Sequence, residues 1–370
     1  MASTVATRVR KLVTGADLFN RSDSCPVLCF KLGALRVRVI TDDAEFGRRF
    51  ARIFNDCLIS DFDGSPSVPP QLDLKVCSSE TSSAAVAEIF DHDCNSSGAV
   101  LSASFPELDL VPARGDTELG WQFFAQTSDL SRALLAVGEN QIVLDRGLPW
   151  QRIVAHYFVN HVMRLQPDYA FFHAATVAIG NCGVLLAGEK GAGKSTLSLA
   201  LASRGHGFLG DELATIHSIS GMILPFRRAV SIRLGPQAKA VMHYLKSNPV
   251  DKEVLPDGTE RLRVPASQIF PAATGRAVEL THAFFLKEIS EHSKAKAFAF
   301  SWRDMHLLAP LYATVVSMPP AVRTLRFLKL FANVRCYILS PGGTPDETAE
   351  LIESIVERKW DIACSKERSA

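Results

Sequence analysis

The sequence predicts an α/β protein in which an α/β domain, residues 149–370, follows an N-terminal α+β accessory domain, residues 1–148. In the second half an apolar strand, a glycine-rich loop and a helix-prone segment follow one another directly, between Val184 and Gly205. In the first half, short strand patterns surround one helix pattern. Gly147, Pro149 and Trp150 mark a boundary between the two halves.

Composition excludes several classes of protein. The 370 residues carry 40 Lys plus Arg against 39 Asp plus Glu, and this balance argues against a nucleic-acid partner. A hydrophobic fraction of 47% supplies globular cores and excludes a disordered chain. The longest apolar stretches, such as Leu307 to Met318, are far shorter than the roughly 20 residues that cross a bilayer, so we expect no membrane partner. Because the start lacks an apolar signal segment, we expect a cytoplasmic protein. The eight cysteines include no Cys-x-x-Cys pair and are expected to be reduced, packed thiols.

The first half is expected to form strands around one helix. Pro26 to Ile40 reads as two strands, and Asp42 or Asp43 can cap a helix over Ala44–Cys57. Further strands are predicted over Gln71–Val76, Leu101–Phe105 and Trp121–Ala125. No motif in this half indicates a function.

The second half is expected to alternate strands and helices. A helix over Pro149–Gln166 precedes the strands Phe171–Ile179 and Val184–Ala187, which a turn at Gly180 joins as a hairpin. Ser247–Gln268 is polar and rich in turn residues, which fits either a surface loop or a lid. The other predicted elements are a helix over Thr196–Arg204, strands at Phe284–Leu286, Ala297–Trp302 and Cys336–Leu339, and helices near Arg303–Val316, Val322–Ala332 and Thr344–Val356.

The segment between the hairpin and the next helix matches the P-loop, or Walker A, pattern. Its glycines let successive N–H groups point at a phosphate, and the helix that follows adds its positive end. Lys194 would reach the β/γ-phosphates, and the Ser195 hydroxyl would enter a Mg²⁺ shell. We therefore expect ATP and Mg²⁺ as cofactors, with the nucleotide bound by Gly188, Glu189, Lys190, Gly191, Ala192, Gly193, Lys194, Ser195 and Thr196.

Charged residues after this loop complete the predicted site. Asp211 follows the helix closely and is the strongest candidate for a metal carboxylate beside Ser195. Arg227 and Arg228 can clamp a γ-phosphate or an anionic acceptor, or form a solvated surface pair.

Three segments of the second half form a larger pattern: His173-Ala174-Ala175, the run from Gly183 to Ser195, and the run from Arg204 to Glu212. Together they resemble the catalytic core of the HPr kinase/phosphorylase family. The order of a P-loop and a nearby acidic pair is also similar to ATP-dependent phosphoenolpyruvate carboxykinase. The resemblance implies an HPr-kinase-like P-loop domain in which Asp211 and Glu212 divide Mg²⁺ binding and general-base work. We assign both roles to Asp211. It also implies that His173 hydrogen-bonds the transferring phosphate or holds the acidic pair.

The resemblance implies an ATP-dependent kinase that transfers the γ-phosphoryl group to a hydroxyl. The acceptor is a serine of a protein or peptide, or a small molecule, and a homo-oligomer stays open. The alternative is an ATP-controlled binding module or switch without phosphoryl transfer. Thr196 and Glu212 leave this alternative open because they depart from the family pattern. The expected catalytic residues are Asp211, Glu212, His173, Lys194 and Arg228.

Overall fold

The computed structural model describes fourteen stretches of the chain. They are residues 27–59, 72–79, 110–112, 122–126, 134–137, 141–145, 151–234, 242, 251–254, 260–271, 273, 275–289, 294–299 and 320–357. The predicted strand Leu101–Phe105 and helix Arg303–Val316 lie outside these residues. The structure mixes helices with three sheets, which confirms the α/β class.

The first sheet has seven strands in the order β1-β2-β3-β7-β6-β5-β4. Strands β1 and β2 form an antiparallel hairpin, β2, β3 and β7 run parallel, and the last three strands add on antiparallel to one another. The bounds are β1 Val27–Leu32, β2 Leu35–Thr41, β3 Leu72–Ser79, β4 Leu110–Pro112, β5 Gln122–Gln126, β6 Leu134–Val137 and β7 Gln141–Asp145.

Two helices pack against this sheet and share one aromatic core. Helix α3 (Ala44–Ile53) begins where the Asp43 carboxylate accepts the N–H groups of Glu45 and Phe46, both at 2.9 Å. A 3-10 turn, η1 (Asn55–Cys57), follows it. The first sheet, α3 and η1 are called the first unit below. Helix α6 (Gln151–Arg164) places Phe158 edge-on against aromatic rings of this unit. The helix that the sequence assigns to the second domain therefore contributes to the core of the first sheet. The rings that contact Phe158 are those of Phe30, Phe50 and Phe54.

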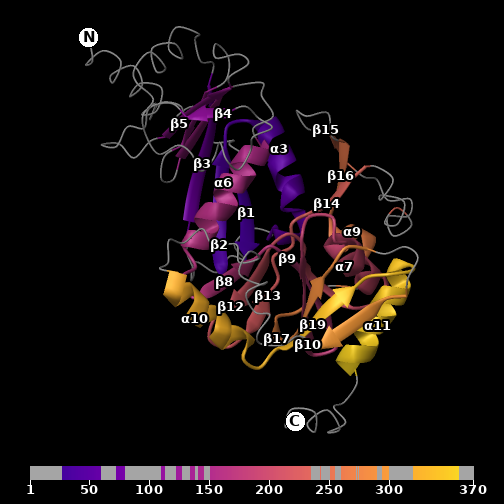
Figure 1. The fold of residues 1–370 in the computed structure, drawn as a ribbon. Coiled ribbons are helices and arrows are strands. Elements are labelled where there is room, and N and C mark those ends of the chain that lie inside the picture. Colours follow the sequence, from indigo (N-terminus) through magenta and orange to yellow (C-terminus); the bar gives the residue numbers. More distant parts are fainter. Residues whose placement is uncertain are drawn as a thin grey trace.

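The second sheet has nine strands and lies below the first in Figure 1. Its order is β11-β9-β10-β17-β13-β12-β8, and β19 joins β17 while β18 joins β19. The neighbouring strands β10, β17 and β19 run parallel. The bounds are β8 Tyr169–Phe172, β9 Ala174–Ile179, β10 Cys182–Gly188, β11 Gly207–Gly210, β12 Ala214–His217, β13 Met222–Leu224, β17 Val278–Leu286, β18 Lys296–Ala299 and β19 Arg335–Ser340.

One predicted strand in this region is wrong. The apolar run Phe171–Ile179 was expected to be continuous, but it divides at His173 into β8 and β9. Strand β8 pairs with β12, whereas β9 pairs with β10 and β11, so the two halves occupy separate positions in the sheet. The predicted hairpin of β9 and β10 is confirmed.

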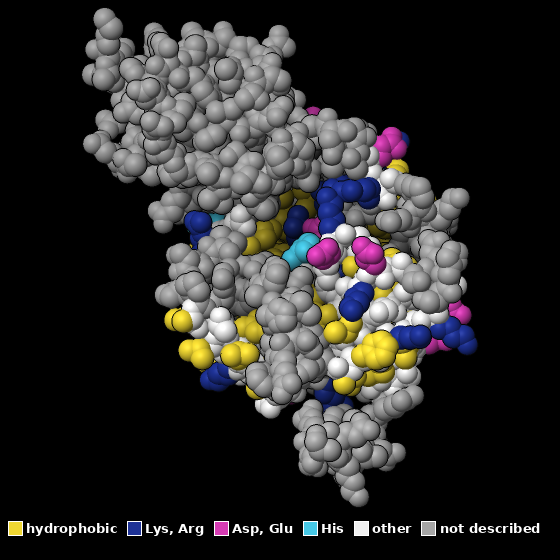
Figure 2. Space-filling view, in the orientation of Figure 1, with side chains coloured by type: hydrophobic (Ala, Val, Ile, Leu, Met, Phe, Trp, Pro, Cys, Tyr) yellow, Lys and Arg dark blue, Asp and Glu magenta, His cyan; other side chains and the backbone are white. Residues whose placement is uncertain are grey.

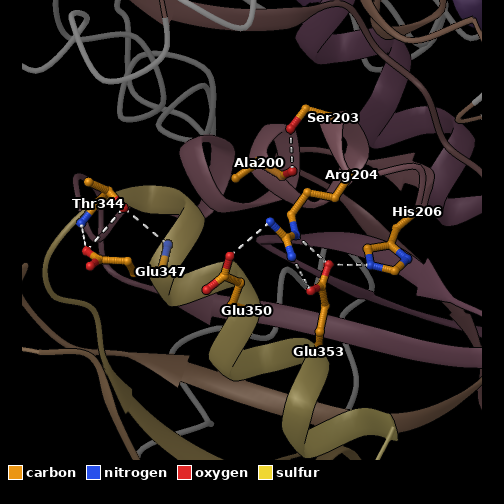
Figure 3. Close-up of polar contacts among 8 residues, drawn as sticks. All are labelled: Ala200, Ser203, Arg204, His206, Thr344, Glu347, Glu350 and Glu353. Atoms are coloured by element: carbon orange, nitrogen blue, oxygen red, sulfur yellow. Dashed lines mark hydrogen bonds and ion pairs between the residues drawn. The ribbon is translucent and has the colours of Figure 1, made fainter.

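Helices cover both faces of the second sheet (Figure 1). Helices α7 (Lys194–Ser203) and α11 (Pro345–Glu357) pack into one core with β10, and α10 (Pro320–Phe331) packs into another with β8. Figure 3 shows Arg204, just after α7, directed at two glutamates of α11. Its Nε and Nη2 donate to the two carboxylate oxygens of Glu353 at 2.6 and 2.7 Å, and His206 Nε2 lies 2.7 Å from the same carboxylate. This bidentate contact fixes α11 on α7.

A third, three-stranded sheet contains part of the predicted surface loop. Its order is β14-β16-β15, with β14 Val230–Arg233, β15 Asp251–Val254 and β16 Glu260–Val264. The short helix α9 (Ala266–Ile269) follows β16. The described parts of Ser247–Gln268 are thus two paired strands and a helix rather than a surface loop.

The described residues bear on the membrane and the cysteines. Among these residues, no helix combines the length and the apolar character needed to cross a membrane. The structure describes the side chains of four cysteines, and these form no disulfide: Cys29, Cys57, Cys182 and Cys336.

Candidate functional site

One edge of the second sheet collects the predicted site. Strand β9 runs antiparallel to both of its neighbours, β10 and β11, so the carboxyl ends of β10 and β11 and the amino end of β9 meet at the same edge. The glycine-rich loop follows β10, Asp211 follows β11, and His173 precedes β9. Strand order alone therefore brings together residues that are up to 38 positions apart.

The glycine-rich loop turns sharply between β10 and α7. Gly191 and Gly193 both have φ of 93°, a left-handed conformation that a side chain would disfavour. Gly193 is also the N-cap of α7, and no side chain caps this helix end. Its first-turn N–H groups point out of the helix end, which is a favourable arrangement for binding an anion.

Lys194 lies beneath this loop. Its side chain is 8% exposed, and its ammonium donates to the carbonyl oxygens of Gly188 at 2.8 Å and Glu189 at 3.0 Å. Burial lowers the pKa of Lys194, and the carboxylates of Asp211 and Glu212 oppose that shift. The ammonium is therefore held at the loop by carbonyl groups and is close to both acids.

Asp211 and Ser195 are in direct contact. The Ser195 hydroxyl donates to Asp211 Oδ2 at 2.7 Å. Asp211 is 3% exposed, and its other oxygen, Oδ1, is buried without a hydrogen-bond partner among the described residues. Burial is the main cause that raises the pKa of Asp211 to about 6, and the neighbouring Glu212 adds to the shift. This carboxylate therefore carries a desolvation cost that a cation could relieve.

The donor set at this point fits Mg²⁺. A serine hydroxyl and an aspartate carboxylate are hard oxygen ligands, and Asp211 Oδ1 still has coordination capacity. In the described part of the chain there is no cluster of three or more His, Cys, Asp or Glu side chains that could hold a metal ion. A metal here would therefore take its remaining ligands from phosphate oxygens and water.

Glu212 adopts an unusual backbone conformation. Its φ is 66°, which for a residue other than glycine costs about 1–3 kcal/mol. Its carboxylate Oε2 lies 3.5 Å from Arg228 Nη1, and 39% of its side chain is exposed. Burial opposes ionisation of Glu212, but the guanidinium groups of Arg228 and Arg263 outweigh burial and lower its pKa.

His173 contacts the backbone of the acidic pair. Its Nδ1 lies 3.0 Å from the carbonyl oxygen of Glu212. Because a carbonyl only accepts, Nδ1 carries the proton of the neutral ring and Nε2 carries the lone pair. Burial and Lys194 lower the pKa of His173, which favours this neutral form.

The two adjacent arginines have different surroundings. Arg227 donates from Nε to the carbonyl of Phe208 at 3.0 Å and from Nη2 to the carbonyl of Gly275, so these groups of Arg227 support the backbone rather than form a phosphate clamp. Arg228 faces Glu212, and its guanidinium lies 5.4 Å from the centroid of the Phe54 ring. The predicted pair therefore separates, and Arg228 is the member at the site.

The structure adds residues that the sequence analysis missed. Arg261 and Arg263 on β16 act electrostatically on Glu212. Their alternation with the buried Leu262 and Val264 is a strand signal that could have been recognised. Phe54 comes from the first unit, and no sequence pattern connects it to Arg228. Histidine, acidic and basic side chains gather near the middle of the face in Figure 2.

Part of this chain is similar to known proteins. A family model, HPr Serine kinase C-terminal domain, matches residues 166–231, which include the candidate site around Lys194 and Asp211. The HPr kinase/phosphorylase of Pelodictyon phaeoclathratiforme is 43% identical over 49 residues, which are 13% of this chain and 15% of the relative. That of Chlorobium phaeobacteroides is 40% identical over 65 residues, 17% of this chain and 20% of the relative. The chain thus matches a fifth or less of the length of these relatives.

One solved structure aligns with part of the chain. The Hpr(Ser) kinase/phosphatase from Coxiella burnetii aligns with 54% of this chain and 94% of its own, at 15% sequence identity and a TM-score of 0.26. The match to the family model contains the hairpin, the glycine-rich loop, Asp211 and Arg228. The resemblance inferred from the sequence is confirmed: this chain is HPr-kinase-like, through a segment at residues 166–231 that matches the HPr Serine kinase C-terminal domain.

Proposed function

We propose that this chain is an ATP-dependent kinase that transfers the γ-phosphoryl group to a hydroxyl with the help of Mg²⁺. The observation that carries the proposal is the contact between Ser195 and Asp211 at the start of α7, with one Asp211 oxygen buried and unpartnered in the described structure. The matched relatives support a kinase-type function, and their names describe kinases of HPr, a protein acceptor. For this chain we propose a serine of a protein or peptide, or a small molecule.

The loop would bind the triphosphate through its backbone. The N–H groups around Gly191 and Gly193 and the start of α7 suit phosphate oxygens. Lys194 would exchange its contacts with loop carbonyls for the β- and γ-phosphates. Catalysis at such a site is mostly positioning and charge stabilisation, because phosphoryl transfer needs little covalent help from the protein.

Ser195 and Asp211 would hold the magnesium ion through their oxygen atoms. When bound, Mg²⁺ neutralises charge that develops on the phosphate oxygens. His173 would keep the acidic pair in place through the Glu212 carbonyl, and Arg228 would orient the Glu212 carboxylate.

The general base is one of the two acids. Asp211 Oδ1 has no hydrogen-bond partner among the described residues and can accept a proton, whereas the Glu212 carboxylate already forms an ion pair with Arg228. This difference favours Asp211. A comparison of Asp211→Asn with Glu212→Gln separates the roles. Loss of a residue that is only the base lowers kcat with little change in the KM for ATP, whereas loss of a residue that also holds Mg²⁺ raises this KM as well.

The ion pair between Arg228 and Glu212 also supports a second candidate, a nucleotide-controlled binding module. In such a module the pair would be a structural contact, and ATP would change the protein's affinity for a partner without transfer.

The test is transfer of ³²P from γ-labelled ATP into a lysate or metabolite pool, with mass spectrometry of the labelled species. The kinase proposal expects an acceptor-dependent label that both Lys194→Ala and Asp211→Asn abolish. ATP binding without any labelled product would favour the switch, and a label that persists in Lys194→Ala would refute the assigned site.

A further inference from the structure

The end of α3 in the first unit contacts the backbone that carries Arg228. The Ala229 N–H donates to the Ile53 carbonyl at 2.8 Å, and the Cys57 thiol donates to the Arg227 carbonyl at 3.0 Å. Burial raises the pKa of Cys57 to about 12, so the group remains a thiol that can donate. The residues on both sides of Arg228 are therefore hydrogen-bonded to the segment Ile53–Cys57.

Phe54 supports the Arg228 side chain itself. The guanidinium lies 5.4 Å from the ring centroid, within the range of a cation–π contact. Phe54 is fully buried, and the rings of Phe30 and Phe158 meet it edge-on at 5.7 and 5.3 Å. A ring held in this way is a rigid platform, and it orients a planar guanidinium better than a mobile side chain would.

The same segment also contacts helix α9, which directly follows the strand that carries Arg261 and Arg263. The Asp56 carboxylate accepts the Ser267 N–H at 3.0 Å and also the Ser267 hydroxyl. Ser267 lies in α9, four residues after Arg263 and three after Val264, which ends β16. The Ile53–Cys57 segment therefore contacts the residues beside Arg228 and the helix that follows the strand of Arg261 and Arg263.

Arg228 is linked to the acidic pair by backbone as well as by charge. The Phe226 N–H donates to the Leu209 carbonyl at 2.8 Å. This approach requires Gly210, because a Cβ there would lie 2.7 Å from the Phe226 carbonyl oxygen. The contacts form a continuous path from α3 through residues 226–229 to residues 209–212.

From this path we infer that the segment Ile53–Cys57 of the first unit is a positioning element of the transfer site, with Phe54 acting on Glu212 through Arg228. The inference rests on the proposed function for its catalytic consequence. It gives the N-terminal unit a role that no sequence motif indicates. Phe54 is too deeply buried to touch a substrate, so its effect is on geometry.

A double-mutant cycle on phosphoryl transfer tests this role. Phe54→Leu removes the ring beneath Arg228, and we expect kcat to fall roughly tenfold with the KM for ATP nearly unchanged, because the nucleotide loop is not displaced. Phe54→Leu added to Arg228→Ala should cause no further loss. Phe46→Leu is the matched control, since Phe46 is a buried ring of α3 that stacks on Phe50 rather than beneath Arg228. Additive losses in the cycle, or equal kcat losses in the two Phe variants, would overturn the inference.

Hydrogen exchange gives a readout that does not depend on activity. With melting temperatures of both variants measured first, peptides covering residues 207–213 and 226–230 should exchange faster in Phe54→Leu than in Phe46→Leu. Equal exchange at these peptides would overturn the positioning role. If the parent protein transfers no phosphate at all, the proposed function fails, and the exchange comparison still decides whether the segment positions Arg228.

Discussion

Replacement of Asp211 by Asn is expected to stabilise the metal-free protein while it abolishes transfer. Asp211 is 3% exposed, and its pKa rises from 3.8 to about 6 on folding. Since the folded state binds the proton more tightly than the unfolded state, the free energy of unfolding falls as pH rises from about 4 to 6. Two pKa units at 1.36 kcal/mol each give a loss of about 3 kcal/mol, which is complete above pH 6. Asn removes this loss but leaves a buried amide donor, so we expect a net gain of about 1–2 kcal/mol.

The assay is urea unfolding in EDTA without nucleotide, at pH 4 and pH 8. The gain of Asp211→Asn over the parent should be present at pH 8 and small at pH 4, where the parent carboxyl is largely protonated. Glu212→Gln is a matched control for which we expect the opposite change in the free energy of unfolding. Arginines lower the pKa of Glu212, so removal of its charge should destabilise the protein at pH 8. A parent protein more stable than Asp211→Asn at pH 8 would refute the reasoning.

Three further predictions concern the loop and its surroundings. Lys194→Ala should weaken ATP binding at least tenfold by calorimetry without loss of the fold, and unchanged affinity would contradict its role. Gly193→Ala should lower the affinity for ATP, because the left-handed backbone costs about 1–2 kcal/mol with a side chain and the added Cβ would contact Ile289. Gly205→Ala is the control: Gly205 has a φ of 94° and open space around it, so this variant should lower only the melting temperature. Glu353→Gln should cost about 1–2 kcal/mol at pH 7 by urea unfolding, because it removes the charge that Arg204 binds. Because the folded pKa of Glu353 is lowered, this difference should narrow below about pH 4, and a constant difference would argue against the ion pair.

The structure around the glycine-rich loop was predictable because it is formed by consecutive residues. The strand before it, the glycines and the helix after it are joined covalently, so a local pattern contains the whole arrangement. The hairpin of β9 and β10 was predictable for the same reason. The break at His173 was not, since the residues on both sides are buried and apolar, and only pairing with distant strands decides where each half lies.

The arrangement around Arg228 shows a second limit of sequence reasoning. Arg227 and Arg228 are neighbours of identical chemistry, and the sequence does not tell which one turns to the backbone and which one to the site. The answer depends on Phe54 and Cys57, which are more than 150 residues away along the chain. Helical spacing predicted that Phe54 packs in a core. It did not predict that the Arg228 guanidinium lies over this ring, because that contact forms only when distant parts of the chain fold together.

The energetics of the site explain why two units of the chain meet there. Ionisation of Asp211 costs the metal-free protein about 3 kcal/mol of stability, mainly through burial, and Glu212 adds about 1–3 kcal/mol of backbone strain directly beside it. Isolated loops do not hold such conformations, because the chain would relax to a solvated, unstrained state. The opposing contribution comes from the aromatic cluster around Phe54, which fixes Arg228, and from the hydrogen bonds of Ile53 and Cys57 to the residues beside it. Weakening that cluster should therefore release the acidic pair before it unfolds the second sheet, and exchange at residues 207–213 is where that release would appear first.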